Sequence, residues 1–487
     1  MPNQNRGVVR TRSLREKRFQ RPQRAWKRLR AGFRPFEEKG YMRYNKVLGF
    51  GGFGIVQQWE VYKPDGTFDR TVAIKTVTRS DHKSSCDALK REIWWNKRFT
   101  GSEHLVQLVN LDPEVTRALD INNENTEGVP IMVMEELGRG SLGLLLSRIS
   151  AMKRTNSLLP VESRGIEYIP NRALWSIFLC LVRACIGMAY PSADPLDRRG
   201  LNVRESIADV PEDARGANII HFDIDIFNTF VADPKDCGRD VEHNWAPVVK
   251  IADYGCMVEW DDNWDDRKKR SSLWGKNRYK APEQFPWRAF NHGTLGPHTN
   301  VYQIGNVMHD LITMRQIPFS QRERKTREAA GGAAQFSTYG WRLLESSDYV
   351  IQEDWGRVDL ELRELVAGCM AQEPAWRPDM GQLERLIESR MGELTAQAEH
   401  DRLHPDENPF APGEDTPGEE VYRRRIPMWR AEPDEFVERF YREYFWETWG
   451  DGDRYANYWD NRTLTPDQEL EPASQPANSL SPPPLLQ

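Results

Sequence analysis

Two short stretches near the middle of the chain decide how the rest of the sequence is interpreted. Residues 221–228 read HFDIDIFN, and residues 253–255 read DYG. Asp223 and Asn228 are five positions apart, and Asp253 follows 25 residues after Asn228. In such a set, one acid can orient a hydroxyl group while the amide and the second acid hold Mg²⁺ over a triphosphate. The spacing alone would occur by chance, so its meaning depends on what lies upstream.

A glycine-rich turn lies upstream of these acids. Residues 49–56 read GFGGFGIV, and the motif glycines are Gly49, Gly51 and Gly54. Glycines there let a hairpin backbone approach phosphates without a clash from Cβ atoms. A dinucleotide-binding fold would place a helix directly after the turn, whereas a β-rich run follows here. The order argues against a Rossmann site, although a plain glycine turn explains the motif alone equally well.

A lysine and a glutamate follow the turn. Lys75 ends the apolar run Val72-Ala73-Ile74, and burying its amine is costly unless the amine is paired. The candidate partner is Glu92, on a helix predicted around residues 86–99. Without Lys75, Glu92 would be interpreted as an ordinary solvated helix acid. A lysine–glutamate pair behind a glycine hairpin is suited to holding the α- and β-phosphates of a nucleotide.

Size and composition bound the fold and its setting. The 487 residues, of which 39% are hydrophobic and 29% charged, suffice for one large bilobal domain or for several ordinary ones. The net charge of −6 gives no reason to expect general polyanion binding. Six cysteines without a CxxC pair are typical of reduced structural thiols, not of a disulfide framework or a zinc site.

Charge is distributed unevenly towards the two ends of the chain. Residues 1–34 hold twelve Lys and Arg against a single acid, and residues 401–487 hold nineteen acids against nine bases. Such asymmetry is typical of tails. We therefore expect residues 1–40 to be a basic arm that is disordered or loosely helical, with no apolar segment after it to indicate a secretory signal. Residues 396–487 are expected to be an acidic, Pro-rich tail with an aromatic helix at 433–449, which either docks on the core or binds a partner.

Between the tails, the pattern changes once from strand-rich to helical. Residues 41–137 contain β-branched runs broken by turn residues, with one helix among them. Residues 138–395 are mostly helical, and their polar stretch at 191–217 is expected to be an inserted surface loop. The longest apolar run, Ala173 to Tyr190, carries Arg183 at its middle and predicts a buried helix rather than a membrane span.

In this order, the motifs resemble those of the eukaryotic protein kinase superfamily, over roughly Tyr44 to Ser389. The resemblance implies an α+β, bilobal, protein-kinase-like fold, in which a small antiparallel β-sheet lobe with one helix precedes a mainly helical lobe. It also implies ATP and Mg²⁺ as cofactors and a protein as the second substrate. Glu283 and Arg377 resemble the pair that forms a structural salt bridge in the large lobe. No DNA- or RNA-reading module is visible, so we expect no specific nucleic-acid partner.

The resemblance also assigns roles to individual residues, in two groups. The group around the phosphates and the reacting hydroxyl comprises the covering loop (Gly49, Gly51, Gly54), the activating ion pair (Lys75, Glu92), the catalytic base (Asp223) and the Mg²⁺ ligands (Asn228, Asp253). The group around adenine comprises the sandwiching side chains (Val56, Ala73, Phe230), the gatekeeper (Met134) and the hinge (Glu135, Glu136, Leu137).

Five positions depart from the family pattern. Phe222 replaces the arginine that docks an activation-segment phosphate, so regulation by that route is not expected. Tyr254 keeps an aromatic ring after the metal-binding acid. Asn96 puts an amide where an apolar residue is expected, and Asn300 neutralises an anchoring acid. Asp225 replaces the lysine two residues after the catalytic base, and an added acid there opposes charge development on the transferred group.

Lys276 is a second unusual residue, and its positive charge is complementary to the negative charge of Asp225. Lys276 lies in the stretch GKNRY at residues 275–279, where serine/threonine kinases usually carry a threonine that contacts the missing lysine. We interpret the two changes as a charge swap, in which Lys276 pairs with Asp225 and supplies the lost cation. The alternative is drift in a protein that no longer transfers phosphate.

The sequence therefore predicts an ATP- and Mg²⁺-dependent protein kinase, with serine or threonine favoured over tyrosine as the acceptor. The alternative is a pseudokinase that binds nucleotide weakly or not at all and acts as a scaffold, with its tails recruiting protein partners. A kinase-fold enzyme that acts on a small molecule is a more remote alternative. The cysteine usage predicts a cytoplasmic or nuclear location.

Overall fold

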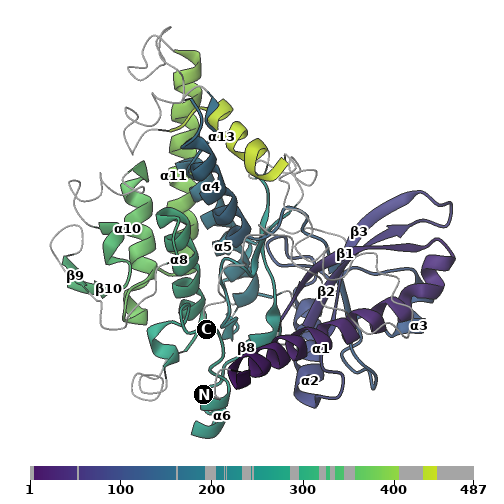
Figure 1. Cartoon of the computed structure of the whole chain (residues 1–487). Coiled ribbons are helices and arrows are strands. Elements are labelled where there is room, and N and C mark those ends of the chain that lie inside the picture. The colour runs from purple at the N-terminus through teal and green to yellow at the C-terminus, as the bar shows by residue number, and fades with distance from the viewer. Residues whose placement is uncertain are drawn as a thin grey trace.

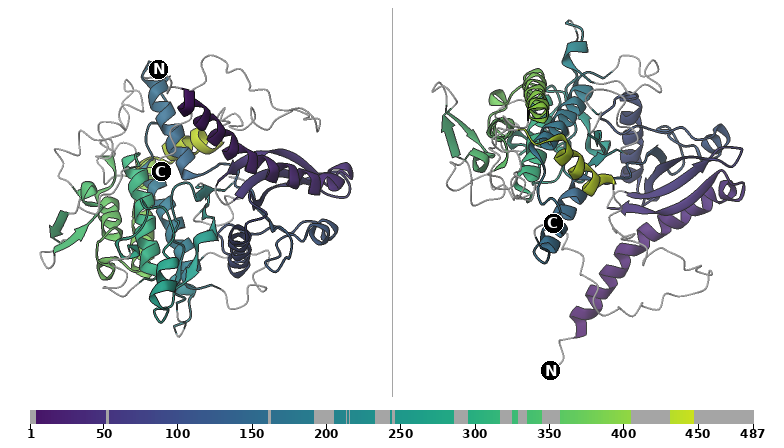
Figure 2. Two further views of the ribbon diagram at one scale, coloured as in Figure 1. Left: turned by 60° about the horizontal axis from the view of Figure 1, so that its bottom comes forward. Right: turned by 90° about the horizontal axis from the view of Figure 1, so that it is seen from above.

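The computed structural model has a small sheet-rich lobe beside a larger helical lobe (Figure 1, Figure 2). The residues that it describes are 5–51, 54–160, 163–191, 205–212, 214, 216–232, 243, 246–285, 295–316, 325–328, 335–344, 357–404 and 431–446. The arrangement confirms the α+β, bilobal fold predicted from the sequence.

The small lobe is built on a four-stranded antiparallel sheet in the order β1-β2-β3-β4. Its strands are β1 (Met42–Phe50), β2 (Gly54–Tyr62), β3 (Phe68–Val77) and β4 (Ile131–Glu135). β-branched and aromatic side chains suit a pleated, half-buried surface, and Trp59, Val72 and Ile74 are fully buried in this sheet. The connection from β3 to β4 carries two helices, α2 (Lys83–Arg98) and α3 (Pro113–Leu119).

The N-terminal arm is helical and packed, whereas the sequence predicted an arm that is disordered or only loosely helical. Residues Asn5–Glu38 form helix α1, which lies along the sheet of the small lobe (Figure 1). Its buried side chains recur at helical spacing and are Ala25, Leu29, Phe33 and Phe36. The ring of Phe33 lies 4.9 Å from that of Trp59, between centroids. The many arginines hide this apolar stripe in the sequence. The guanidinium of Arg30, for example, lies 4.4 Å above the ring of Tyr44 in a cation–π contact.

The large lobe is built around helix α5 (Asn171–Ala189), which is buried along its whole length. The longer helices around it are α4 (Leu142–Asn156), α8 (Pro297–Thr313), α10 (Leu360–Cys369) and α11 (Met380–Leu403). Among the described residues, α5 alone has the length and hydropathy of a membrane span. Because its residues are all buried inside the protein, it is the buried core helix that the sequence predicts.

Short elements position the loops between the helices. The paired strands are β5 (Ile219–Ile220) with β8 (Val258–Glu259), β6 (Thr229–Val231) with β7 (Val249–Ile251), and β9 (Lys325–Glu328) with β10 (Gln335–Thr338). The short helices are α6 (Asp266–Ser271) and 3₁₀ turns at Ile207–Asp209, Tyr254–Cys256, Pro282–Gln284, Trp341–Leu344 and Pro374–Trp376. The strands of the β5–β8 and β6–β7 pairs flank residues 221–228 and residues 253–255.

Part of the C-terminal region belongs to the large lobe. It forms helix α13 (Asp434–Tyr441) and a π-helical turn (Arg442–Trp446), which lie beside α4 (Figure 1). Its side chains buried in the core of the large lobe are Phe436, Val437, Phe440, Tyr441, Tyr444 and Phe445. Arg148 of α4 donates to the Tyr444 carbonyl at 2.6 Å. Of the two alternatives for the aromatic helix, the structure has the docked one.

Two of the segments expected from the sequence lie largely outside the described residues. Most of the insertion at 191–217 and most of the tail at 396–487 lie there. Within the insertion, Glu205 and Ser206 are described and buried, so this part is not a surface loop.

We expect Phe440→Ala to destabilise the large lobe by about 3–5 kcal/mol, because a fully buried ring is replaced by a cavity. Differential scanning calorimetry measures the loss as a lower thermal midpoint. Leu403→Ala at the end of α11 is the matched control, since Leu403 is exposed. Equal midpoints for the two variants would show that α13 does not stabilise the lobe.

Candidate active site

A buried ammonium group joins three elements at the junction of the lobes. Lys75 on β3 donates to both carboxylate oxygens of Glu92 on α2, each at 2.8 Å. It also donates to Asp253, just after β7, at 3.1 Å. The side chains of Lys75 and Glu92 are 12% and 5% exposed, whereas that of Asp253 is 44% exposed. The arrangement therefore leaves one acid of the cluster open to a ligand.

Two carboxylates share this one ammonium, and their pKa values diverge. Burial would lower the pKa of Lys75, but Asp253 and Glu92 outweigh it and raise that pKa. Burial raises the pKa of Glu92 to about 7 against the opposing effect of Lys75. Burial also acts to raise the pKa of Asp253, but Lys75 outweighs it and holds that pKa below its ordinary value. Asp253 is thus the firmly ionised acid of the cluster, as a divalent cation requires.

The pairing of β6 with β7 brings the second candidate metal ligand to the first. Thr229 pairs with Ile251, and the Ala252 amide donates to the Asn228 carbonyl at 2.9 Å. Asn228 and Asp253 therefore lie at the same end of this two-stranded sheet. The Asn228 side-chain nitrogen donates to Asp223, to its carbonyl at 2.8 Å and to its carboxylate at 3.0 Å. With the nitrogen so used, the amide oxygen is the atom suited to a cation, and the oxygen donors fit Mg²⁺.

Lys276 lies beside Asp223 and Asp225, the two acids within residues 221–228. Its ammonium pairs with Asp225 and lies 3.4 Å from Asp223, so the pairing expected from the sequence is present. Its backbone amide also donates to Asp223 at 3.3 Å. Burial raises the pKa of both acids, and Lys276 opposes that rise. The lysine thus supplies the positive charge that keeps two neighbouring carboxylates compatible.

A glycine makes this approach of Lys276 possible. Gly275 has φ of +96°, and a Cβ there would lie 1.9 Å from the Phe222 carbonyl oxygen. Any side chain at this position would push residues 253–283, called the activation segment below, away from residues 221–228. The contact therefore depends on Gly275 as well as on the two charged residues.

The residues expected around adenine lie on neighbouring strands. Val56 on β2 pairs with Lys75 on β3, and Ala73 pairs with Met134 on β4. Phe230 on β6 forms an isolated bridge with Ser141 from the segment that follows the hinge. The strand register thus places the expected sandwich close to the ion pair, but the residues of the covering loop at 52–53 are outside the described range. Of its glycines, Gly51 donates to the Gly54 carbonyl at 2.8 Å.

The expected hinge is anchored by residues that the sequence analysis missed. Lys250 of β7 donates to both carboxylate oxygens of Glu135, at 2.9 and 3.0 Å. The Gln107 amide donates to the same carboxylate at 2.8 Å, and the Glu135 amide donates to the Gln107 carbonyl at 3.0 Å. The apolar neighbours of Lys250 were the only sequence signal that its charge needs a buried partner.

Two of the departures from the family pattern are accommodated locally, and a third is accommodated in part. The Tyr254 hydroxyl donates to the Ile251 carbonyl at 3.0 Å, so the extra polar group is satisfied. Asn300 accepts from the His221 amide at 3.0 Å and donates to the Ile219 carbonyl at 2.9 Å, so it anchors the catalytic stretch without a charge. Asn96 is satisfied only in part: its nitrogen donates to the Glu92 carbonyl at 3.0 Å, whereas its buried oxygen has no hydrogen-bond partner among the described residues. The structural pair is also present, with Arg377 donating to Glu283 at 2.7 and 2.8 Å.

The fourth departure replaces a charge with packing. Phe222 is fully buried and has φ of +65°, and its ring lies 6.4 Å from that of Trp260 in an edge-to-face arrangement. The buried cluster comprises Ile220, Phe222, Trp260 and Leu295, with Cys256, Val258, Trp264 and Leu273 packed against it. Most of these residues belong to the activation segment. An apolar contact therefore holds this segment where the family arginine would bind a phosphate.

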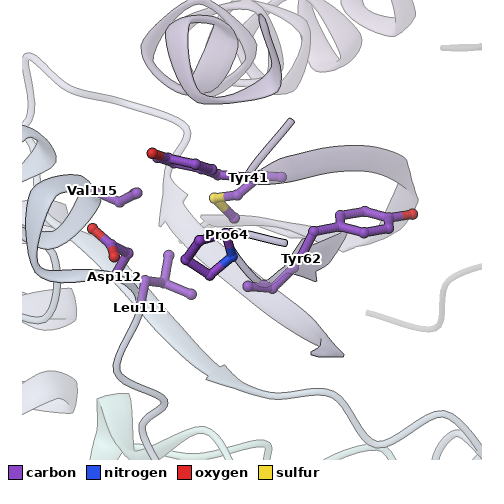
Figure 3. Close-up of a pocket in the computed structure, with 8 residues that line it drawn as sticks. Tyr41, Tyr62, Pro64, Leu111, Asp112 and Val115 are labelled. Carbon is purple, nitrogen blue, oxygen red and sulfur yellow. The ribbon is translucent and has the colours of Figure 1, made fainter. Parts of the chain in front are cut away.

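A small hollow at the outer edge of the small lobe is separate from this site. It measures about 30 Å³ and is lined by residues that include Tyr41, Tyr62, Leu111 and Val115 (Figure 3). This volume suits a water molecule or two and not a nucleotide. The chemistry suggested by the sequence lies instead at the Lys75 cluster.

The candidate site lies within a part of the chain that matches a known protein family. A family model described as protein tyrosine and serine/threonine kinase matches residues 42–387. A search of curated proteins finds no match to the chain. The matched range begins with β1 and ends within α11, and it contains every residue of the candidate site.

We expect Trp260→Ala to loosen the activation segment, because it removes the ring against which Phe222 packs, at a local cost of roughly 3–5 kcal/mol. Hydrogen–deuterium exchange should become faster over residues 256–276 and stay unchanged in β3. Trp274→Ala is the matched control, because Trp274 lies on the same segment and is 49% exposed. The interpretation fails if the two variants exchange alike.

Proposed function

Because the chain belongs to the protein tyrosine and serine/threonine kinase family, we propose that it transfers the γ-phosphoryl group of ATP to a hydroxyl group of a protein. The observation that carries this proposal is the Lys75 cluster, in which one ammonium lies 2.8 Å from Glu92 and 3.1 Å from Asp253. Kinases need this pair and this acid in place at the same time. A chain that had lost nucleotide chemistry would have no reason to keep all of them.

Each residue of the site has a role that its contacts support. Lys75, held by Glu92, would neutralise the non-transferred phosphates. Asn228 and Asp253 would hold Mg²⁺, which would neutralise the negative charge that develops during phosphoryl transfer. Asp223 is the base that would orient the acceptor hydroxyl, and the Asn228 amide fixes its carboxylate at 3.0 Å.

Lys276 would supply the cation usually found two residues after the base. Its side chain is 49% exposed, and its ammonium pairs with Asp225, whose side chain is fully buried. It therefore faces both the acid pair and the space in front of them. A cation placed there offsets the added acid and stabilises negative charge on the transferred group. The stretch at 275–283 favours serine or threonine as the acceptor.

A pseudokinase is the second candidate function. The departures that favour it are the buried amide at Asn96 and the acid at Asp225, since neither belongs to an ordinary kinase site. Such a protein would bind nucleotide weakly or not at all and act as a scaffold. We also propose a cytoplasmic or nuclear location, because of the cysteine usage, with protein partners recruited by the terminal regions.

Nucleotide binding and transfer separate the two functions. We expect ATP with Mg²⁺ to raise the thermal midpoint of the full chain, and radiolabelled phosphate to be transferred to a generic protein substrate. Asp253→Asn should reduce transfer by roughly 100-fold or more, because it removes the ionised metal ligand. Asp266→Asn, an exposed acid of the same segment, should leave transfer unchanged. Binding without transfer would support the pseudokinase, and loss of both would exclude a nucleotide function.

The charge swap gives a separate test. We expect Lys276→Thr to reduce transfer by about 100-fold or more, because the catalytic cation is removed. Adding Asp225→Lys should restore part of this loss. Full rescue is not expected, since Asp225 also accepts from the Phe227 and Asn228 amides at 2.7 and 2.9 Å.

Two controls accompany this test, one for the position of the lysine in the chain and one for folding. Lys269→Thr removes another lysine of the activation segment and should keep wild-type transfer. Thermal midpoints of all variants identify any that fail to fold. Unchanged transfer in Lys276→Thr would disprove the swap.

A further inference from the structure

Three buried side chains from distant parts of the chain meet behind the catalytic strands. They are His104, in the turn after α2, Cys180, in the middle of α5, and His243, which precedes β7. Their potential ligand atoms all lie within 4.8 Å of one another. The exposed fractions are 0% for His104, 0% for Cys180 and 1% for His243. Nothing in the proposed kinase chemistry uses these residues.

The spacing of the two imidazoles fits a shared metal ion. Their Nε2 atoms lie 3.2 Å apart. A tetrahedral zinc ion with Zn–N bonds of about 2.0–2.1 Å separates two nitrogen ligands by roughly 3.3 Å. A plain hydrogen bond between two neutral imidazoles would have a similar length, so the distance needs a second observation.

A carboxylate on the far side of His104 provides that second observation. Glu205 lies 2.7 Å from His104 Nδ1, and its other oxygen accepts from the His104 backbone amide at 3.2 Å. With its Nδ1 proton donated to Glu205, His104 presents the Nε2 lone pair to the other two side chains. Histidines that bind metals commonly make this contact to a carboxylate, which fixes the ring and its tautomer.

We propose that His104, Cys180 and His243 bind a zinc ion. Imidazole nitrogen and thiolate sulfur are the ligands that Zn²⁺ takes in proteins, whereas Mg²⁺ prefers oxygen. The site is therefore chemically distinct from the oxygen donors Asn228 and Asp253. The absence of a CxxC pair from the sequence favours structural thiols over a zinc site. The ligands are instead 76 and 63 positions apart, so no local spacing could show them.

The position of the zinc site suggests a structural role for the ion. The His104 carbonyl accepts from the Ile251 amide at 3.0 Å, and the Val106 amide donates to the Ile251 carbonyl at 3.1 Å. Ile251 ends β7, two residues before Asp253. A zinc ion would thus tie the turn after α2, helix α5 and the segment before β7 together behind the metal-binding acid.

Metal analysis of the full chain tests the proposal independently of catalysis. We expect one zinc ion per chain after purification without chelators, measured by inductively coupled plasma mass spectrometry. His104→Ala and Cys180→Ser should lose the zinc. Cys185→Ser is the matched control, since Cys185 is buried on the same helix and should leave the zinc content unchanged. Extraction with EDTA should lower the thermal midpoint, and ZnCl₂ should restore it.

Cobalt substitution tests the ligands without any variant that has to fold. The wild-type chain, stripped of metal and titrated with CoCl₂, should show the intense near-ultraviolet band of a thiolate bound to cobalt. The proposal is overturned if the purified chain contains no zinc and takes up neither ZnCl₂ nor CoCl₂. It is also overturned if Cys180→Ser keeps its zinc, or if cobalt binds without the thiolate band. A chain that takes up no metal would leave His104 and His243 as a hydrogen-bonded pair.

Discussion

The site depends on the burial of one ammonium group. Lys75 lies at the end of an apolar strand, and a charge in that position is tolerated only with close partners. Its two partners come from different lobes, Glu92 from helix α2 and Asp253 from the segment after β7. The cluster of Lys75 with its two acids therefore forms only when helix α2 and the large lobe are correctly placed against the sheet. The Lys250–Glu135 pair works in the same way nearby, where it joins the strand before Asp253 to the end of β4.

Packing takes over a task that a charge performs in related sequences. With Phe222 in place of an arginine, the catalytic stretch presents a ring, and Trp260 of the activation segment packs against it. An arginine needs a phosphate or an acid to be satisfied, whereas an aromatic cluster is satisfied by burial alone. The placement of the activation segment is thereby built into the fold. Gly275 lets the segment continue directly past the Phe222 carbonyl to bring Lys276 to the acids.

The sequence identified residues that the fold brings together at the candidate site more readily than it identified the surroundings of that site. Lys75, Glu92, Asp223, Asn228 and Asp253 are identified by residue type and order, because each position demands one chemistry. Helix α1 was missed since its apolar stripe is diluted by arginines, and only the packing of Phe33 on Trp59 reveals its role. The His104–Cys180–His243 cluster could not be predicted, because residues so distant in sequence are related only through the fold. Whether the aromatic helix docks was open for the same reason.

The contacts of Asp225 bear on whether the unusual residues arose by drift. Burying a carboxylate without a partner would cost several kcal/mol. The Asp225 side chain is fully buried, so an unpartnered acid that appeared there by chance would destabilise the fold and would not be expected to persist. Asp225 instead accepts from two backbone amides and pairs with Lys276, which is itself a departure. Two independent accidents would have had to produce complementary charges at positions 51 residues apart, and a glycine that lets them meet. Joint change under a constraint is the simpler explanation, and the proposed phosphoryl transfer would supply that constraint.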